Sequence, residues 1–187
     1  MARVDILFEG YVGTRVAGTV SLVRDGEVVA IVDPGMVPNR AAILGPLAAL
    51  EVSPEDVTDV ILSHHHPDHT VNIALFPHVR VHDHWAVYEN DIWTSRPAEG
   101  FEVAPDITLM ETPAHTPQDI TTLVRTDQDV YAFTHLWWHS VAAEDPLAAQ
   151  PNLLQSNRDR VLEAATVIVP GHGAPFVAAD APRSELS

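Results

Sequence analysis

The sequence contains neither cysteine nor lysine. Without cysteine, the chain forms no disulfide, binds no zinc through thiolates and has no thiol nucleophile. All 10 basic residues are arginine. The absence of lysine excludes a P-loop phosphate site, Schiff-base chemistry and a serine–lysine acylation pair. Any catalysis must therefore use other side chains.

Long hydrophobic runs are also absent, since none approaches the roughly 20 apolar residues that cross a bilayer. The opening segment "MARVDILFEGYVG" lacks the basic and apolar regions of a signal peptide. We therefore expect a cytoplasmic protein that does not associate with membranes. The formal net charge of −16 disfavours a nucleic-acid partner, because affinity for polyphosphate comes largely from Lys and Arg. A small-molecule substrate is the expected partner, and the pattern does not indicate an oligomeric state.

A chain of 187 residues suits a single domain spanning residues 1–187. Short apolar strands alternate with helical patterns, which predicts an α/β fold. The expected strands lie within residues 4–12, 18–26, 27–35, 56–63, 78–84, 106–115, 119–127, 129–138 and 166–173. The expected helices lie within residues 38–52, 70–76 and 157–165. Residues 84–101 predict a loop or short helix over a cleft, with Trp85, Tyr88 and Trp93 as candidates for its wall.

Histidines gather where several of these strands end. Strand residues two apart project from the same side, so in "SHHHPDH" we expect His64 and His66 to converge on one ion. Pro67 turns the chain, so that Asp68 and His69 face a second position close by. Two further histidines follow strands: His115 in "TPAHTP" and His172 in "VPGHG". Neutral imidazole and carboxylate suit Zn²⁺ well, and iron or manganese acceptably.

Together with "IVDPG" at residues 31–35, these segments resemble the metallo-β-lactamase fold superfamily. The similarity is greatest to the branch around metallo-β-lactamase domain-containing protein 1. The resemblance implies an αββα sandwich, in which helices flank two mixed sheets and one or two zinc ions lie at one edge. It also implies that His64, His66 and His115 hold one metal, that Asp68, His69 and His172 hold a second, and that Asp33 orients a ligand through a hydrogen bond.

The sequence departs from the family pattern at one position. The family usually places a Gly-Asp pair after the strand that follows the third ligand, and this aspartate bridges both metals. Here Thr134-His135 stands in its place. A neutral imidazole has one free lone pair, so His135 can serve only one ion unless it loses a second proton. We therefore predict uneven occupancy, with one firm ion and a second that is weak or absent; His135 as a core residue is the alternative.

The resemblance implies a metal-dependent hydrolase in which a metal-bound hydroxide attacks a small ester, thioester or lactone. Asp68 is the expected catalytic carboxylate: it either ligates the second metal or acts as a general base. Two alternatives remain: a one-iron dioxygenase of the persulfide type, and a metal-binding protein with a degenerate active site.

The other histidines are expected to be bystanders. We expect His65 to support a ligand or lie at the surface, and His78, His82 and His84 to lie at the surface. His139 is also expected to be a bystander, although it lies close enough in sequence to replace His135. Trp137 and Trp138 are expected in the core and at its rim.

Overall fold

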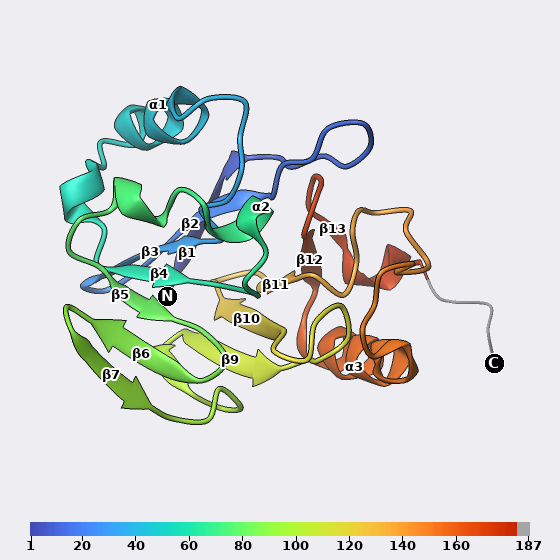
Figure 1. The fold of residues 1–187 in the computed structure, drawn as a ribbon. Coiled ribbons are helices and arrows are strands. Elements are labelled where there is room, and N and C mark those ends of the chain that lie inside the picture. The colour runs from blue at the N-terminus through green and yellow to red at the C-terminus, as the bar shows by residue number, and fades with distance from the viewer. Residues whose placement is uncertain (183–187) are drawn as a thin grey trace.

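Residues 1–182 are described by the computed structural model, which forms two β-sheets with helices outside both (Figure 1). Within these residues, one sheet has seven strands in chain order: β1 Arg3–Phe8, β2 Val20–Asp25, β3 Val28–Val32, β4 Asp59–Ile61, β5 Arg80–His82, β6 Ala86–Glu89 and β7 Ile92–Ser95. The other has six: β8 Glu102–Ala104, β9 Ile107–Glu111, β10 Ile120–Arg125, β11 Val130–Thr134, β12 Val167–Pro170 and β13 Phe176–Val177. The α-helices are α1 Ala41–Ala49, α2 Pro67–Thr70 and α3 Pro151–Ala164. The short 3-10 helices are η1 Pro54–Asp56, η2 Ile73–Leu75 and η3 Ala178–Asp180.

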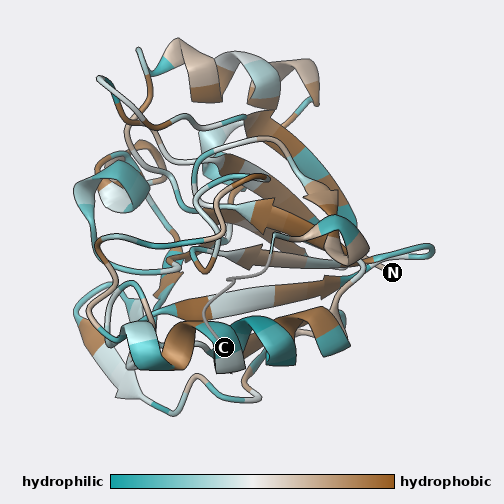
Figure 2. Cartoon of the chain, turned by 90° about the vertical axis from the view of Figure 1, so that its right-hand side faces the viewer, coloured by the Kyte–Doolittle hydropathy of each residue, from teal (hydrophilic) through white to brown (hydrophobic). Residues whose placement is uncertain are grey.

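Both faces of each sheet are apolar, because each face packs against another layer. Successive residues of a strand point to opposite faces, and in β3 Val32 joins the core between the sheets while Ile31 packs on the other side. There Ile31 belongs to a cluster with Ile43 and Leu47 of α1. In the second sheet, α3 covers the outer face in the same way, in a cluster that contains Trp137, Leu154, Val161 and Ile168. Figure 2 shows hydrophobic strands lying between helices at the top and bottom of the view.

Both sheets are mixed, and this arrangement positions the histidines. Strand β3 runs parallel to β4, and β11 runs parallel to β12, whereas most of the other pairs are antiparallel. The carboxyl ends of parallel neighbours meet at the same edge of a sheet, where open α/β sheets commonly bind ligands. The segments that follow β3, β4, β11 and β12 carry Asp33, residues 63–69, His135 and His172.

The expectation for residues 84–101 was wrong. Strands β6 and β7 form an antiparallel hairpin there, in which Glu89 pairs with Ile92 across a two-residue loop. Asn90 begins this loop with φ of 55°, the left-handed conformation that Asn tolerates well. All four residues of β7 are exposed. The strand therefore has no buried face that would require apolar and polar residues to alternate in its sequence.

The remaining differences lie at the boundaries of elements. The helix expected at residues 157–165 begins earlier, at Pro151, which occupies its first turn. The short helix expected at residues 70–76 is divided between α2 and η2. Strands β8 and β13 were not expected, because three and two residues are too few to carry a period. Within residues 1–182, no helix is both long and apolar enough to cross a bilayer.

Candidate metal centre

The loop that carries most of the histidines is held from two sides through the backbone of Asp68. The Asp68 carbonyl accepts hydrogen bonds from Gly18 N at 3.2 Å and Met36 N at 3.1 Å. A Cβ on Gly35 would lie 1.6 Å from this carbonyl oxygen, and one on Gly18 would lie 2.3 Å from it. The backbone of Asp68 thus lies against Gly35, the last residue of the "DPG" turn, and only glycine at this position leaves room for the Asp68 carbonyl.

Asp33 connects the end of β3 to the same loop. Its Oδ1 accepts a hydrogen bond from Ser63 N at 2.7 Å, and its Oδ2 accepts bonds from Ser63 Oγ at 2.6 Å and from His69 Nδ1 at 2.9 Å. Asp33 has φ of 52°, a left-handed conformation in which Asp is several-fold enriched. The aspartate thus fixes the His69 ring and leaves the Nε2 lone pair of His69 free.

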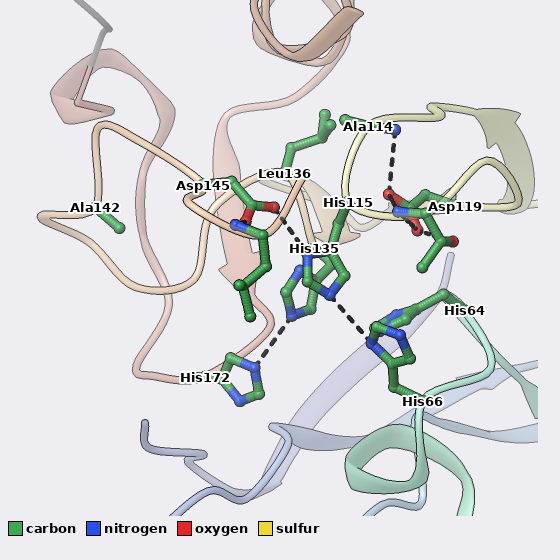
Figure 3. Close-up of polar contacts among 12 residues, drawn as sticks. His64, His66, Ala114, His115, Asp119, His135, Leu136, Ala142, Asp145 and His172 are labelled. Atoms are coloured by element: carbon green, nitrogen blue, oxygen red, sulfur yellow. Dashed lines mark hydrogen bonds and ion pairs between the residues drawn. The ribbon is translucent and has the colours of Figure 1, made fainter. Parts of the chain in front are cut away.

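His64, His66 and His115 form the first group, called here the three-histidine group. The Nδ1 atom of His66 lies 3.1 Å from the Nε2 atoms of both His64 and His115 (Figure 3). The outer nitrogens of the buried pair are occupied, since His64 Nδ1 lies 3.0 Å from Ser63 Oγ and His115 Nδ1 lies 2.9 Å from Asp145 Oδ2. Such hydrogen bonds fix the ring tautomer and direct the other nitrogen toward a metal.

Asp68, His69 and His172 form the second group. Asp68 Oδ2 lies 3.7 Å from His69 Nε2 and 3.6 Å from His172 Nε2. His172 Nδ1 donates to the carbonyl of Ala17 at 3.0 Å, which leaves its Nε2 as the free acceptor. His69 Nε2 is buried and has no hydrogen-bond partner. A buried polar atom without a partner costs about 1–3 kcal/mol, and a cation between these three side chains would satisfy it.

His135 lies between the two groups. Its side chain is 2% exposed, and its Nε2 is 3.1 Å from the Nε2 of His172. Its ring centroid is 4.7 Å from that of His64 and 5.0 Å from that of His69, and the ring stacks on His115 at 4.1 Å. The structure therefore brings together all seven residues expected to bind metal.

Burial keeps most of these imidazoles neutral. It lowers the pKa of His64 and of His135 well below the ordinary value, and the neighbouring imidazoles lower both further. The pKa values of His66 and His172 are also lowered, mainly by burial. Burial opposes the charged form of His115 too, but its hydrogen bond to Asp145 outweighs this and raises the pKa. Neutral imidazole is the form that ligates metals, so the donor set fits a divalent ion.

A cavity of about 300 Å³ opens beside the two groups. Five of the residues predicted to bind metal face it: His66, Asp68, His115, His135 and His172. Its remaining walls are apolar and come from two loops: Val12 and Val16 before β2, and Trp138 and Leu147 after β11. Trp85 and Trp93 do not line it. They line a separate pocket of about 690 Å³, so both form the wall of a cleft, but not of the one beside the predicted ligands; Tyr88 lines neither.

Among the bystander histidines, the expectation for His82 was wrong. It is 2% exposed and its Nε2 lies 2.7 Å from the buried Asp59 carboxylate. His78 is exposed, and His65 is exposed with its Nε2 3.0 Å from Asp83. Trp137 belongs to the core at 0% exposure.

Two functional features were missed in the sequence. Asp145 reaches His115 from the loop after β11 and had no signal beyond being an acidic residue in a loop. Arg158 of α3 supports this loop: its guanidinium donates to the carbonyls of Leu136 at 2.7–3.0 Å and to those of Ala142 and Ala143. At 1% exposure, Arg158 holds the backbone on which Trp138 and Asp145 are placed.

Comparison with known proteins identifies the family. The sequence profile described as "Metallo-beta-lactamase superfamily" matches residues 13–174. The chain belongs to this superfamily. All seven predicted ligands of this superfamily member lie inside the matched range.

Metallo-beta-lactamase domain-containing protein 1 is a relative in several vertebrates. The protein of Xenopus laevis is 31% identical over 92% of this chain and 80% of its own length. The protein of Homo sapiens is 33% identical over 78% of this chain. The alignments span 58–62% of the human, mouse and rat proteins, so this superfamily member spans about three fifths of those chains.

Solved structures show the same fold. A Thermotoga maritima protein described as a metallo-beta-lactamase has a TM-score of 0.77 at 19% identity, over 94% of this chain and 99% of that chain. An N-acyl homoserine lactone hydrolase with the product N-hexanoyl-L-homoserine at its catalytic metal center has a TM-score of 0.66 at 18% identity, over 91% and 92%. A third protein, in a di-iron-bound form, has a TM-score of 0.68 at 19% identity, over 92% and 95%.

Proposed function

We propose that this chain is a zinc-dependent hydrolase that acts on a small ester, thioester or lactone. The observation that carries the proposal is the three-histidine group beside an apolar cavity. Three histidines with a free fourth position are the ligand set of catalytic zinc in carbonic anhydrase. Here His66 and His115 line the cavity, and a substrate in it would lie directly against the group.

Asp68 would hold or move the proton during hydrolysis. When bound, a zinc ion would lower the pKa of a water ligand to about 7 and polarise the substrate carbonyl. Asp68 is the acidic side chain among the residues that line the cavity, and it is 18% exposed. A carboxylate at this place accepts a proton from the attacking water, or returns one to the leaving oxygen.

The cavity walls favour a neutral substrate with an apolar acyl group. Val12, Val16, Trp138 and Leu147 offer apolar contact, and neither Arg nor Lys lines the cavity. A phosphodiester or another strongly anionic substrate would therefore meet no cationic side chain there, and only the metal would oppose its charge. The lactone hydrolase of the same fold supports lactones as the first class to test.

The decisive experiment combines metal counting with a substrate panel. We expect zinc in the purified protein and turnover of apolar-acyl lactones or esters above that of bis(p-nitrophenyl) phosphate. Asp68→Asn should lower kcat by at least about 100-fold, and metal retention distinguishes its two roles: retained metal with lost turnover favours a proton carrier. Bound metal without turnover of any ester, thioester or lactone would favour a metal-binding protein with a degenerate site.

A mononuclear iron oxygenase is the second candidate, supported by the di-iron-bound protein of the same fold. Non-haem iron oxygenases typically use two histidines and one carboxylate, whereas the three-histidine group contains no carboxylate. This difference favours the hydrolase. Iron in the purified protein, together with oxygen consumption in the presence of a thiol persulfide, would favour the oxygenase over the hydrolase.

A further inference from the structure

A second pocket, called here the tryptophan pocket, lies beside the β6–β7 hairpin (Figure 1) and has a volume of about 690 Å³. This volume is typical of small-molecule sites, and none of the seven predicted metal ligands is among its described lining residues. Trp85, just before β6, is 43% exposed there, and Trp93 of β7 is 62% exposed. Exposed apolar side chains that gather in one place mark interaction sites.

The backbone on both sides of the hairpin is held beside Arg96. Trp85 N donates to Asp83 Oδ1 at 2.7 Å, and the Trp85 carbonyl accepts a bond from Arg96 N at 3.0 Å. The centroid of the Trp93 ring lies 4.8 Å from that of Tyr88, and Tyr88 OH donates to Asp83 Oδ2 at 2.7 Å. Only side chains therefore need to adjust when a ligand enters this pocket.

The Arg96 side chain brings an unpaired cation to the tryptophan pocket. Its Nε and both Nη atoms are buried, and none has a hydrogen-bond partner among residues 1–182. Asp83 and Glu111 attract it, but Asp83 is bonded as above, and Glu111 Oε1 accepts from two backbone N–H groups at 3.2 and 3.3 Å. Burial lowers the pKa of Arg96 and these charges only partly offset it, yet a guanidinium stays protonated at neutral pH. A buried cation without a partner is costly, so Arg96 would stabilise an anion in the pocket.

The other polar groups of the wall restrict the kind of anion. His84 has a buried Nδ1 that also lacks a partner, which leaves a further position for a hydrogen bond. Glu111 lines the same pocket and would repel a second negative charge, so a monoanion fits better than a phosphate. The planar guanidinium matches a carboxylate through two parallel hydrogen bonds, and the two tryptophans favour a flat aromatic body.

We propose that the tryptophan pocket binds a flat aromatic monocarboxylate, whose ring packs on Trp85 and Trp93 and whose carboxylate pairs with Arg96. Because the Arg96 nitrogens are buried, an exposed side chain of the wall would turn aside as the ligand enters, and such rotamer changes are common on binding. This pocket shares no described lining residue with the cavity beside the predicted metal ligands, so the proposal does not depend on the proposed hydrolase activity.

Calorimetry with zinc-loaded protein tests the proposal with two probes, naphthoate and the uncharged naphthylmethanol. We expect naphthoate to bind with a dissociation constant below about 1 mM. Naphthylmethanol has the same rings without the charge, and it should bind at least about tenfold more weakly.

Arg96→Met should weaken naphthoate binding at least about tenfold and leave naphthylmethanol binding unchanged. Because the variant removes a buried cation that has no partner, its Tm should not fall. A merely structural role for Arg96 would instead lower Tm without separating the two probes. Arg125→Met is the matched control, since it removes the same charge from a side chain that is 63% exposed and lies outside the pocket.

Trp93→Ala keeps the test decisive if Arg96→Met folds poorly. Trp93 is exposed, and its loss should weaken both probes at least about twofold. Ile92 is equally exposed on β7 but does not line the pocket, so Ile92→Ala should weaken neither probe. In crystals of the zinc-loaded protein with bromonaphthoate, the anomalous signal of bromine should lie beside Trp85 and Trp93.

The proposal is overturned by an absence of binding at about 10 mM naphthoate, by equal affinity for the two probes, by unchanged naphthoate affinity in Arg96→Met, or by bromine found only in the cavity beside the predicted metal ligands. A dimer in ultracentrifugation that Trp93→Ala dissociates and naphthoate does not would also overturn it. A second copy would then occupy this face along the exposed edge strand β7.

Discussion

Replacing Asp33 with asparagine tests whether one carboxylate organises the whole centre. Asp33 accepts three hydrogen bonds at 2.6–2.9 Å from Ser63 and His69, and through Ser63 Oγ it also supports His64. An asparagine oxygen can keep the bond from Ser63 N. Its amide nitrogen, however, would face two donors, the Ser63 hydroxyl and His69 Nδ1–H. The substitution therefore loses two hydrogen bonds to a charged acceptor.

The expected magnitude follows from those two bonds. A hydrogen bond to a charged group contributes about 1.5–3 kcal/mol, so Asp33→Asn should lower the free energy of unfolding of the metal-free protein by about 3 kcal/mol. For a chain of this size, that corresponds to a fall in Tm of roughly 10 °C. Metal affinity should also fall by about 10–100-fold, because the ring of His69 is no longer oriented.

Asparagine isolates the charge from the backbone, because it tolerates the left-handed conformation of Asp33 nearly as well as aspartate does. The assay is urea denaturation in chelator, followed by zinc titration of the folded protein. Asp5→Asn is a matched control: it removes a partly exposed carboxylate that pairs with Arg24 at 2.8 Å, which should cost less than about 1 kcal/mol. A free energy within about 0.5 kcal/mol of the wild type, together with unchanged zinc affinity, would refute the role assigned to Asp33.

Three further predictions concern the support of the centre and of strand β4. Arg158→Met should lower the free energy of unfolding by about 3 kcal/mol, because the carbonyls of Leu136 and Ala143 lose a charged donor. Hydrogen exchange should become faster in residues 136–150, because their loop is no longer held. Unchanged exchange there would contradict the role assigned to Arg158. Asp59→Asn should cost about 2–3 kcal/mol at pH 7, because the buried Asp59 carboxylate accepts a hydrogen bond from the partly exposed Arg80 and contacts the buried His82. Burial raises the pKa of Asp59, but its hydrogen bonds outweigh this effect and leave the pKa lowered. The stability that the Asp59 carboxylate contributes is therefore present above about pH 4 and is lost as the pH falls through the lowered pKa. In acid denaturation, the wild type should lose stability more steeply than the variant below about pH 4. Gly35→Ala should displace the Asp68 backbone, since its Cβ would meet the carbonyl oxygen at 1.6 Å; zinc binding that equals the wild type would show that the turn adapts.

Much of the centre was predictable because its ligands follow strands whose apolar character is strong. Residues two apart on a strand share a side, so His64 and His66 were expected to converge. The structure brings them together, although β4 ends at Ile61 and both histidines lie in the segment after it. The contact between Asp145 and His115 spans 30 residues and depends on how α3 holds a loop without periodicity, so no local pattern could indicate it. His82 was misplaced for a related reason, because the buried Asp59 that pairs with it lies on the neighbouring strand.

The seven residues around the centre come from both halves of the sandwich. His64, His66, Asp68 and His69 follow β4 of the first sheet, whereas His135 and His172 follow β11 and β12 of the second. An ion held by Asp68, His69 and His172 would therefore act as a cross-link between the two layers, in addition to the apolar core and to hydrogen bonds such as that from His172 Nδ1 to the carbonyl of Ala17. At 100 times its dissociation constant, a ligand that binds only the folded state adds about 2.7 kcal/mol of stability. Metal supply would then govern how long the protein survives proteases as well as whether it is active.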